Sequence, residues 1–239
     1  MNKLLTNVKD LKLEKHLLVV GFFAIFSLVY FYPLLQGKAL FQSDIAQFSG
    51  MAKQIVDHRE EFNEDPFWID NAFVGMPSYQ VAADYPFDMM DSLDKLIRFL
   101  PRPADYLFVY LISFYILLVS LGIRMKYAVF GALTFALSTY LIIILGVGHN
   151  TKALAIGYAP IIIAGVHKLL DKKYLPGFIL ASIGLSLQIG ANHYQMTYYF
   201  MMMIGLLLLI DLIFEVKNKS FNFKKIGVFI GAFFLAISL

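Results

Sequence analysis

Hydrophobic residues lie along this chain in long blocks that short polar segments separate. The blocks are roughly 17 to 21 residues long, and about 20 apolar residues in a helix cross the ~30 Å hydrocarbon core of a bilayer. The pattern predicts six complete membrane-spanning helices, at residues 17–36, 105–123, 127–147, 153–170, 175–191 and 194–214. A seventh block begins near Ile226, and we expect the chain end at Leu239 to truncate it. We therefore predict an all-α polytopic membrane protein.

The first block has one feature of a signal peptide, because four lysines precede it within the first 15 positions. A signal peptide has an apolar region of only about 7–15 residues, followed by a cleavage site of small residues. Here the block is longer, and aromatic residues and Pro33 stand where the cleavage site would be. We predict a retained helix at residues 17–36, after a cytoplasmic N-terminus of residues 1–16.

One long segment, residues 37–103, joins the first two blocks. Loops of this length usually contain structure of their own, and two parts of it repeat apolar residues at helical spacing. The first part begins at Ser43, which can cap a helix. Its apolar positions are Ile45, Phe48, Ala52, Ile55 and Phe62. The second part has the stripe Met90, Leu93, Leu96, Ile97 and Leu100, before Pro101 and Pro103. We expect two amphipathic helices on the membrane surface, and the remaining spans with short loops in residues 104–239.

Composition agrees with a membrane location. Hydrophobic residues make up 59% of the 239 residues and charged residues 15%, against roughly 45–50% and about 25% in soluble domains. We therefore expect the lipid bilayer as a partner. The net charge is only +3, so we expect no nucleic-acid partner. Cysteine is absent, which excludes a disulfide framework, a zinc–thiolate site and a thiol nucleophile. The chain also has no Walker loop, dinucleotide fingerprint, HExxH pair or GxSxG elbow.

Basic residues predict the orientation, because cytoplasmic loops of polytopic proteins carry an excess of Lys and Arg. With the N-terminus in the cytoplasm and the sides alternating, 13 of the 20 Lys and Arg residues fall on the cytoplasmic side. Six of the other seven lie in residues 37–103, where a long loop carries little topological weight. We therefore expect the N-terminus in the cytoplasm and residues 37–103 on the other side of the membrane.

Asp44 lies soon after the first block, at the start of the first amphipathic segment. A carboxylate at this position can accept backbone N–H bonds and is favoured by the helix dipole, so capping is one interpretation. The other interpretation is a catalytic base or a ligand of a divalent cation, held where a lipid-linked substrate would present its phosphate. The residues alone leave both open.

Two short polar turns are predicted on the same side as Asp44. One reads GHNTK at 148–152 and the other NHYQ at 192–195. Tight turns explain the Gly and Asn residues, and each His has a structural role as its alternative. Polar residues at membrane depth usually face a cavity or one another. We therefore predict a single site made of Asp44, His149, Asn150, Lys152, Asn192, His193 and Gln195.

Five segments together carry a family resemblance. They read YPLLQGK at 32–38, QSD at 42–44, GMPSYQ at 75–80, GHNTKA at 148–153 and ANHYQ at 191–195, the last followed by TYY at 197–199. In this order they resemble the YfhO family of bacterial membrane proteins, most closely members from Bacteroidetes. The resemblance covers nearly the whole chain. Because members of that family are much longer, we expect an N-terminal fragment.

The resemblance implies a C-type glycosyltransferase (GT-C) helical bundle, whose first outer loop holds surface helices and an essential acidic residue. Asp44 matches that residue. Such enzymes pass a sugar from a polyprenyl-phosphate carrier to an envelope polymer, lipid or protein, often with a divalent cation such as Mg²⁺ or Mn²⁺. The second acidic residue of the superfamily is missing from 148–150, so Asp70, a His or no residue would replace it.

The same hypothesis gives the remaining residues a task. His149, Lys152 and His193 would bind the leaving phosphate, because negative charge develops on it as the glycosidic bond breaks. The irregular stretch at 65–80 holds the only Trp of the chain, and it is either a recognition loop or a plain turn region. As a recognition loop it would bind the sugar or the acceptor through Trp68, Asp70 and Tyr79.

Two other functions remain open on the sequence. A transporter or flippase for a lipid-linked or envelope precursor would have helix-breaking or ionisable residues near mid-bilayer, where the chain offers Gly157, Pro160, Gly184 and Gln188. A non-catalytic scaffold for envelope assembly would need no defined phosphate site.

Overall fold

Helices form nearly all of the regular structure. The computed structural model describes residues 13–81, 89–219 and 223–238. The α-helices are α2 (Leu13–Tyr30), α3 (Ser43–Phe62), α4 (Met89–Ile97), α5 (Ala104–Ser120), α6 (Met125–Ala136), α7 (Thr139–Val147), α8 (Asn150–Leu170), α9 (Tyr174–Gly190), α10 (Tyr194–Lys217) and α11 (Lys224–Ser238). Short 3-10 helices cover Tyr32–Gln36 and Ser78–Gln80, and the strands are β1 (Trp68–Ile69) and β2 (Met76–Pro77). The predicted all-α fold is confirmed for the described residues.

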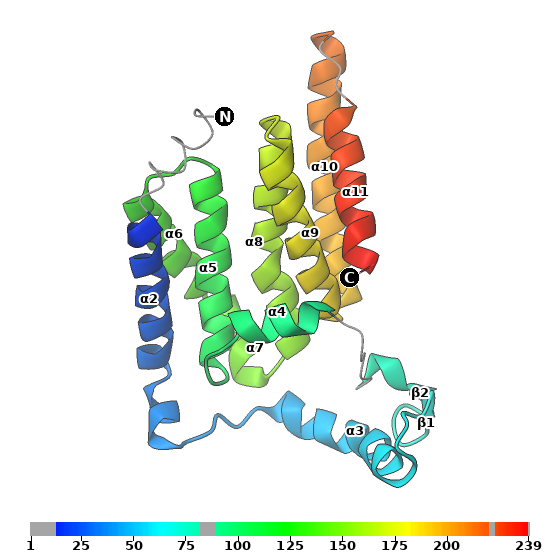
Figure 1. Cartoon of the computed structure of the whole chain (residues 1–239). Coiled ribbons are helices and arrows are strands. Elements are labelled where there is room, and N and C mark those ends of the chain that lie inside the picture. Colours follow the sequence, from blue (N-terminus) through cyan, green and yellow to red (C-terminus); the bar gives the residue numbers. More distant parts are fainter. Residues whose placement is uncertain (1–12, 82–88, 220–222, 239) are drawn as a thin grey trace.

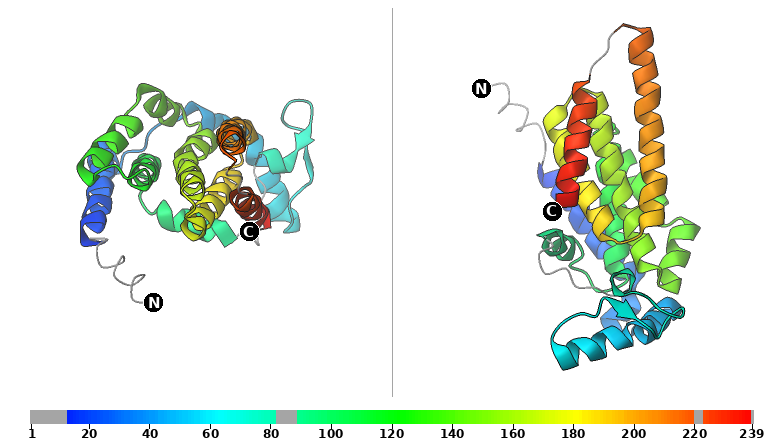
Figure 2. Two further views of the ribbon diagram at one scale, coloured as in Figure 1. Left: turned by 90° about the horizontal axis from the view of Figure 1, so that it is seen from above. Right: turned by 90° about the vertical axis from the view of Figure 1, so that its right-hand side faces the viewer.

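Most of the longer helices run along one common direction, and two helices lie across it. α2, α5, α8, α9, α10 and α11 form a bundle, and α3 and α4 cross the end at which α5, α8 and α10 begin (Figures 1 and 2). α8 is central, because it packs against both α5 and α9 and most of its side chains are buried. α10 buries Ile204 and leaves a long apolar surface exposed.

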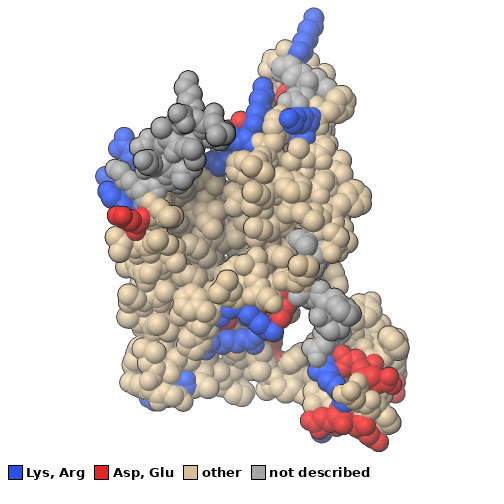
Figure 3. Space-filling model, in the orientation of Figure 1, with Lys and Arg blue, Asp and Glu red and all other residues tan. Residues whose placement is uncertain are grey.

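Helix length and surface character indicate a membrane protein. α2, α8 and α10 are long and apolar enough to cross a bilayer, and α6 with α7 would add a fourth span despite a bend of 49° between them. α5 and α9 have 17 residues each, a rise of about 26 Å at 1.5 Å per residue. Figure 3 shows a broad uncharged surface with Lys, Arg, Asp and Glu gathered toward the two ends. The six complete spans remain a prediction.

Small residues allow the central helices to approach closely. A Cβ added at Gly165 would lie 2.5 Å from the backbone nitrogen of Ala181, and one at Gly184 would lie 2.9 Å from that of Ile162. Glycine at such positions lets helix backbones pack in a membrane, where small residues replace the hydrophobic effect as the basis of association. The α8–α9 contact therefore depends on glycines from both helices.

The first predicted span has different boundaries in the structure. α2 begins at Leu13 and ends at Tyr30, and a 3-10 helix follows at Tyr32–Gln36. Pro33 accounts for the change, because proline has no N–H to donate and its ring clashes with the preceding turn of an α-helix. Residues 13–16 thus belong to the helix instead of the predicted N-terminal segment 1–16, whose residues 1–12 lie outside the described part.

The predicted single span at 127–147 is two helices. α6 ends at Ala136 and α7 starts at Thr139, because Ser138 has an extended backbone with φ −60° and ψ 139°. An extended residue breaks the i to i−4 hydrogen-bond ladder and allows the 49° bend. The only sign of this break in the sequence is the polar pair Ser138 and Thr139, which is too short to end an apolar block.

Residues 43–81 form a small unit that we call the hairpin lobe. α3 packs on the antiparallel β1–β2 hairpin through a core of Ile55, Ile69 and Ala72. Ser43 is not the cap that the sequence predicts, because Gln42 takes the cap position and the helix starts at Ser43 itself. The second amphipathic helix, α4, is shorter than predicted, since it ends at Ile97 and leaves Leu100 outside.

Candidate functional site at the ends of α8 and α10

The side chain of Asp44 contacts His149, which lies 105 positions later in the sequence. Asp44 is the second residue of α3, and His149 is the residue before α8. The contact joins Oδ2 of the partly buried Asp44 to Nδ1 of the exposed His149. Among the described residues, Oδ1 of Asp44 has no hydrogen-bond partner. The capping interpretation therefore loses its hydrogen bond, although the favourable position at the helix N-terminus remains.

Gln42 and Gly148 explain why these two residues meet. Nε2 of Gln42 donates to the carbonyl oxygen of Leu145 at 2.6 Å, which fixes the start of α3 against α7. Gly148 ends α7 with φ +96°, and a Cβ there would lie only 2.8 Å from Cβ of Gln42. A glycine is needed for both the left-handed backbone and the close approach. The turn therefore presents His149 directly to the first turn of α3.

Lys152 and His193 add two nitrogen groups near His149. Lys152 lies in the first turn of α8, and its Nζ stands 5.3 Å from the ring centroid of Tyr140. His193 precedes α10 and accepts a hydrogen bond at Nδ1 from the backbone N–H of Met196, at 3.3 Å. Burial lowers the pKa of His193, and the positive charges of Lys152 and His149 lower it further. Lys152, His149 and His193 thus lie close enough for their charges to interact, and His149 also contacts Asp44.

The three predicted amides behave differently from one another. The Oδ1 atom of Asn150 is buried and has no hydrogen-bond partner within the described residues. Asn192 donates from Nδ2 to the carbonyl oxygen of Tyr79 at 3.4 Å, so it links the hairpin lobe to the α9–α10 turn. Gln195 is exposed and donates to the hydroxyl of Tyr199 on its own helix. Oδ1 of Asn150 is thus an unpaired acceptor, Asn192 makes a long-range structural contact, and Gln195 makes a local one.

The remaining predicted residues belong to the β1–β2 part of the hairpin lobe. Asp70 is exposed, and its backbone N–H donates to Oε1 of Gln54 at 2.8 Å. The ring of Trp68 lies against Gly75, where an added Cβ would be 2.6 Å from Nε1. In the part of the chain that the structure describes, no hydrogen bond or ion pair joins Asp70 to Asp44. The structure therefore joins Asp44 to His149 by direct contact and places Lys152 and His193 within electrostatic range of one another, and it shows no contact from Asp70 or Trp68 to Asp44 among the described residues.

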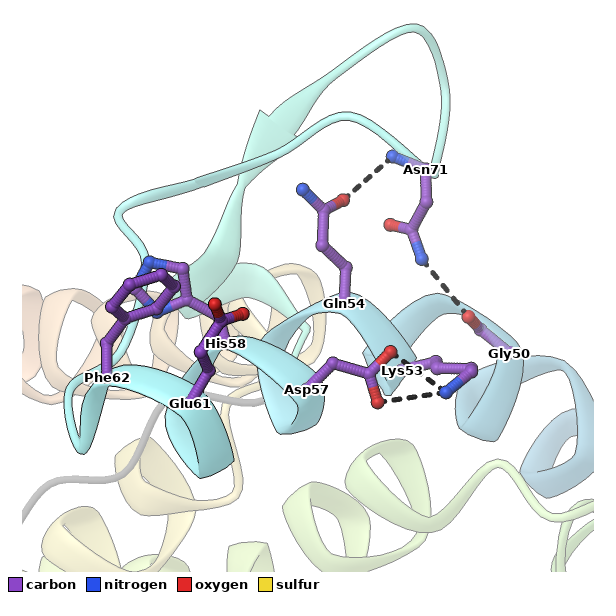
Figure 4. A pocket seen from close by; sticks show the side chains of 8 residues that line it. All are labelled: Gly50, Lys53, Gln54, Asp57, His58, Glu61, Phe62 and Asn71. Carbon is purple, nitrogen blue, oxygen red and sulfur yellow. Dashed lines mark hydrogen bonds and ion pairs between the residues drawn. The ribbon is translucent and has the colours of Figure 1, made fainter.

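A hollow of about 440 Å³ lies on the lobe, apart from these residues. Figure 4 shows its lining, which consists of Gly50, Lys53, Gln54, Asp57, His58, Glu61, Phe62 and Asn71. Lys53 pairs with Asp57 at 2.8 Å, and Asn71 donates to the carbonyl oxygen of Gly50 at 3.2 Å. The ion pair lies within α3, while Asn71 joins the hairpin to α3, so we regard the hollow as a structural feature of the lobe.

No dedicated metal cage is formed by the residues described. Within them, no group of three His, Cys, Asp or Glu side chains stands close enough to hold an ion. Mg²⁺ is often bound by only one or two carboxylates together with substrate phosphates. Asp44 offers one such carboxylate, and it fits a shared site of that kind.

A buried ionic network beside the site was missed by the sequence reasoning. Arg98 donates from Nε to Asp94 at 2.7 Å and from Nη1 to Asp105 at 3.3 Å, and the hydroxyl of Tyr158 donates to Asp94. The side chain of Asp105 is only 2% exposed. The network ties α4 to α5 and α8. The one available signal was a charged residue, Asp105, at the start of an apolar block.

A second buried charge lies at the opposite end of the bundle. The side chain of Lys225 is buried between Asp211 and Glu215, at 3.0 Å from Oε1 of Glu215. Both carboxylates of α10 therefore pair with the neighbouring helix α11.

No protein-family model matches the chain, and no curated protein or solved structure matches it. The resemblance to the YfhO family thus remains a prediction. Any function must be argued from the geometry of Asp44 and its neighbours.

Proposed function

We propose that this protein is a membrane glycosyltransferase of the GT-C type, which transfers a sugar from a polyprenyl-phosphate carrier to an acceptor of the cell envelope. One arrangement carries the proposal: Asp44 contacts His149 at one end of an apolar bundle, and Lys152 and His193 lie close enough for the charges of Lys152 and His149 to act on His193. Glycosyl transfer from a phosphate carrier needs a base for the acceptor and cationic or N–H groups for the leaving phosphate. Both kinds of group are present here.

Asp44 would act as the general base. Its Oδ2 is held by Nδ1 of His149, and Oδ1 would accept the proton of the acceptor hydroxyl while that oxygen bonds to the anomeric carbon. The bond from the anomeric carbon to the phosphate oxygen breaks, and the phosphate leaves with the electron pair. His149 fixes the direction of the carboxylate, because its N–H points at the other oxygen.

Lys152 and His193 would bind the leaving phosphate. Lys152 supplies a fixed positive charge. Because Nδ1 of His193 accepts the Met196 N–H and its pKa is lowered, the ring is neutral with its proton on Nε2. That N–H is a hydrogen-bond donor for a phosphate oxygen. The N-termini of α8 and α10 add N–H groups and the positive ends of their dipoles.

The remaining residues would assist recognition. Asn150 offers an unpaired Oδ1 to a hydroxyl group, and Asn192 fixes the hairpin lobe beside the site. Trp68, Asp70 and Tyr79 would bind the sugar or the acceptor from the lobe, with Gln195 at the rim. A divalent cation such as Mg²⁺ or Mn²⁺, shared between Asp44 and phosphate oxygens, would neutralise charge on the leaving group.

The proposal includes a topology. It has six complete spans, with the N-terminus in the cytoplasm and the hairpin lobe outside, in a bacterial inner membrane. The short helices α5 and α9 would then cross a thin or locally thinned bilayer, because 17 residues fall just below the usual length of a span.

Transfer of a labelled sugar tests the proposal. Purified protein in proteoliposomes would receive a radiolabelled polyprenyl-phosphate sugar and an envelope extract as acceptor. Asp44→Asn should lower transfer by roughly 10²–10⁴-fold, the usual contribution of a general base. Asp57→Asn is the matched control, because Asp57 is an exposed carboxylate on the same helix. Equal transfer by the Asp44→Asn and wild-type proteins would refute the assigned role.

A transporter or flippase is the second candidate, because α6 and α7 form a bent pair within one apolar block. Broken helices commonly line transport sites. The other expected signs are weaker: a Cβ at Gly157 would lie 2.9 Å from Val109, and Gln188 donates to the carbonyl oxygen of Ala155 at 2.9 Å, so both residues serve packing. Movement of the intact lipid-linked sugar between leaflets, without release of the sugar, would identify a flippase. A scaffold would do neither.

A further inference from the structure

The hairpin lobe carries three apolar side chains with almost no contact to the rest of the protein: Phe73 and Val74 in the turn at the tip of the hairpin, and Phe67 just before β1. Phe67 is 95% exposed, Phe73 is 81% exposed and Val74 is fully exposed at 103%. The small core of the lobe lies elsewhere, around Ile55 and Ile69. These three side chains therefore do not stabilise the lobe by burial.

The turn that holds two of them is unfavourable for such residues. The N–H of Gly75 donates to the carbonyl oxygen of Ala72 at 2.9 Å and closes a four-residue turn. Phe73 has φ 51° and Val74 has φ 65° at its centre. Hairpin turns with two positive φ values strongly favour Asn-Gly, and a β-branched residue at positive φ is an outlier. A turn that only reversed the chain direction would not need these residues. We infer that Phe73 and Val74 contact something other than this chain.

The position of the hairpin relative to the candidate membrane span α10 indicates that a bilayer lies next to the exposed side chains. Asn192, which donates to the carbonyl oxygen of Tyr79, belongs to the turn before α10, and α10 is a candidate membrane span. Val74 precedes Tyr79 by five residues, which reach at most about 18 Å in an extended chain. Figures 1 and 2 place the lobe beside the end at which α10 begins.

Exposed aromatic residues continue from the lobe onto this helix. Tyr194 and Tyr198 are exposed in the first turns of α10. Tyr and Trp gather at the headgroup level of membrane proteins, and the headgroup layer on each side of the core is about 5–8 Å thick. The tip is thus within reach of the bilayer surface that surrounds α10.

Charge excludes an electrostatic attachment. The lobe has seven acidic residues and two basic ones in residues 43–81, and Figure 3 shows Asp and Glu gathered on it. An anionic lipid surface repels such a lobe. We propose that Phe67, Phe73 and Val74 insert into the interfacial layer of the bilayer and anchor the hairpin lobe by apolar contact alone. This proposal holds whether or not the protein transfers sugars.

Trp68 provides the test, because it is the only Trp of the chain and lies next to Phe67. The full chain would be reconstituted into zwitterionic bilayers whose phospholipids carry bromine at a shallow or a deep position of the acyl chain. We expect the shallow bromine to quench Trp68 fluorescence more strongly than the deep one. Anionic lipid at low salt should reduce the quenching.

The double variant Phe73→Asn with Val74→Gly removes the apolar tip while giving the turn the residues it favours. We expect its quenching to fall and its far-UV circular dichroism to stay unchanged. Phe48→Asn is the matched control, because Phe48 is an exposed aromatic residue of the same lobe on α3, and its quenching should stay at the wild-type level. The absence of quenching at either depth, or undiminished quenching in the folded double variant, would overturn the proposal. Self-association lost in the double variant would then identify a second copy as the occupant.

Discussion

Replacing Gly148 by Ala should push α3 away from the turn between α7 and α8. The backbone at Gly148 has φ +96°, and an added Cβ would lie 2.8 Å from Cβ of Gln42 and 3.4 Å from Cγ1 of Ile45. A left-handed residue other than glycine costs about 1–2 kcal/mol, and an overpacked contact costs about 1–3 kcal/mol. Alanine also reduces the entropy of the unfolded chain, worth about 0.4–1 kcal/mol. The net loss of stability is therefore about 3 kcal/mol.

The matched control for this variant is Gly146→Ala. Gly146 is in α7, and a Cβ there would meet nothing within 4 Å. Alanine in place of a helical glycine stabilises by about 0.5–1 kcal/mol, so the two variants should shift stability in opposite directions. Thermal unfolding followed by far-UV circular dichroism, in one detergent, would compare them with the wild type. If Gly148→Ala unfolds at or above the wild-type temperature, the close approach of Gln42 to this turn is wrong.

Two further predictions concern charged groups near the site. Arg98→Met should destabilise the protein by about 3–5 kcal/mol in thermal unfolding, because it leaves two carboxylates without their buried partner. Lys95→Met, which removes an exposed ion pair with Asp91 on α4, should have little effect. Equal losses in both variants would count against the network. His193 should titrate below 6.5 in a histidine NMR titration, and Lys152→Ala should raise its pKa by removing a neighbouring positive charge. As the pH falls through this lowered pKa, the ring gains a proton that the unfolded chain binds more readily, so stability should decrease toward acid. An unchanged pKa in Lys152→Ala would show that the two residues are not coupled.

The apolar blocks predicted most of the long helices well, because the thickness of the bilayer core sets the length of both the apolar block and the helix that crosses it. α8, predicted from residue 153, begins at Asn150, and α9, predicted from 175, begins at Tyr174. The break at Ser138 could not be predicted, because it depends on one extended residue inside a block that is apolar on both sides. Hydrophobicity identifies which residues avoid water, and it carries no information on a single backbone angle.

α4 shows a different limit of pattern reasoning. Its polar side was expected to face water, yet Asp94 and Arg98 lie against α5 and α8, while Leu96 is exposed. Polar residues of a surface helix can form hydrogen bonds either with water or with a buried polar group of the protein. The partner here includes Tyr158, which lies 64 positions away, so local periodicity could not distinguish the two cases.

The alternating direction of successive membrane helices allowed the sequence to predict which polar segments share one end of the bundle. Every second helix of an alternating bundle begins at the same end, so the turns before α8 and α10 had to share an end with the segment after the first span. Sharing an end does not bring side chains into contact, and Asp70 shares the end without reaching Asp44. Contact with His149 required Gly148, whose missing side chain admits Gln42 and with it the first turn of α3. Gly148 has no side chain that could take part in catalysis or binding. A search of the sequence for reactive side chains could therefore not identify Gly148, although the contact between Asp44 and His149 depends on it.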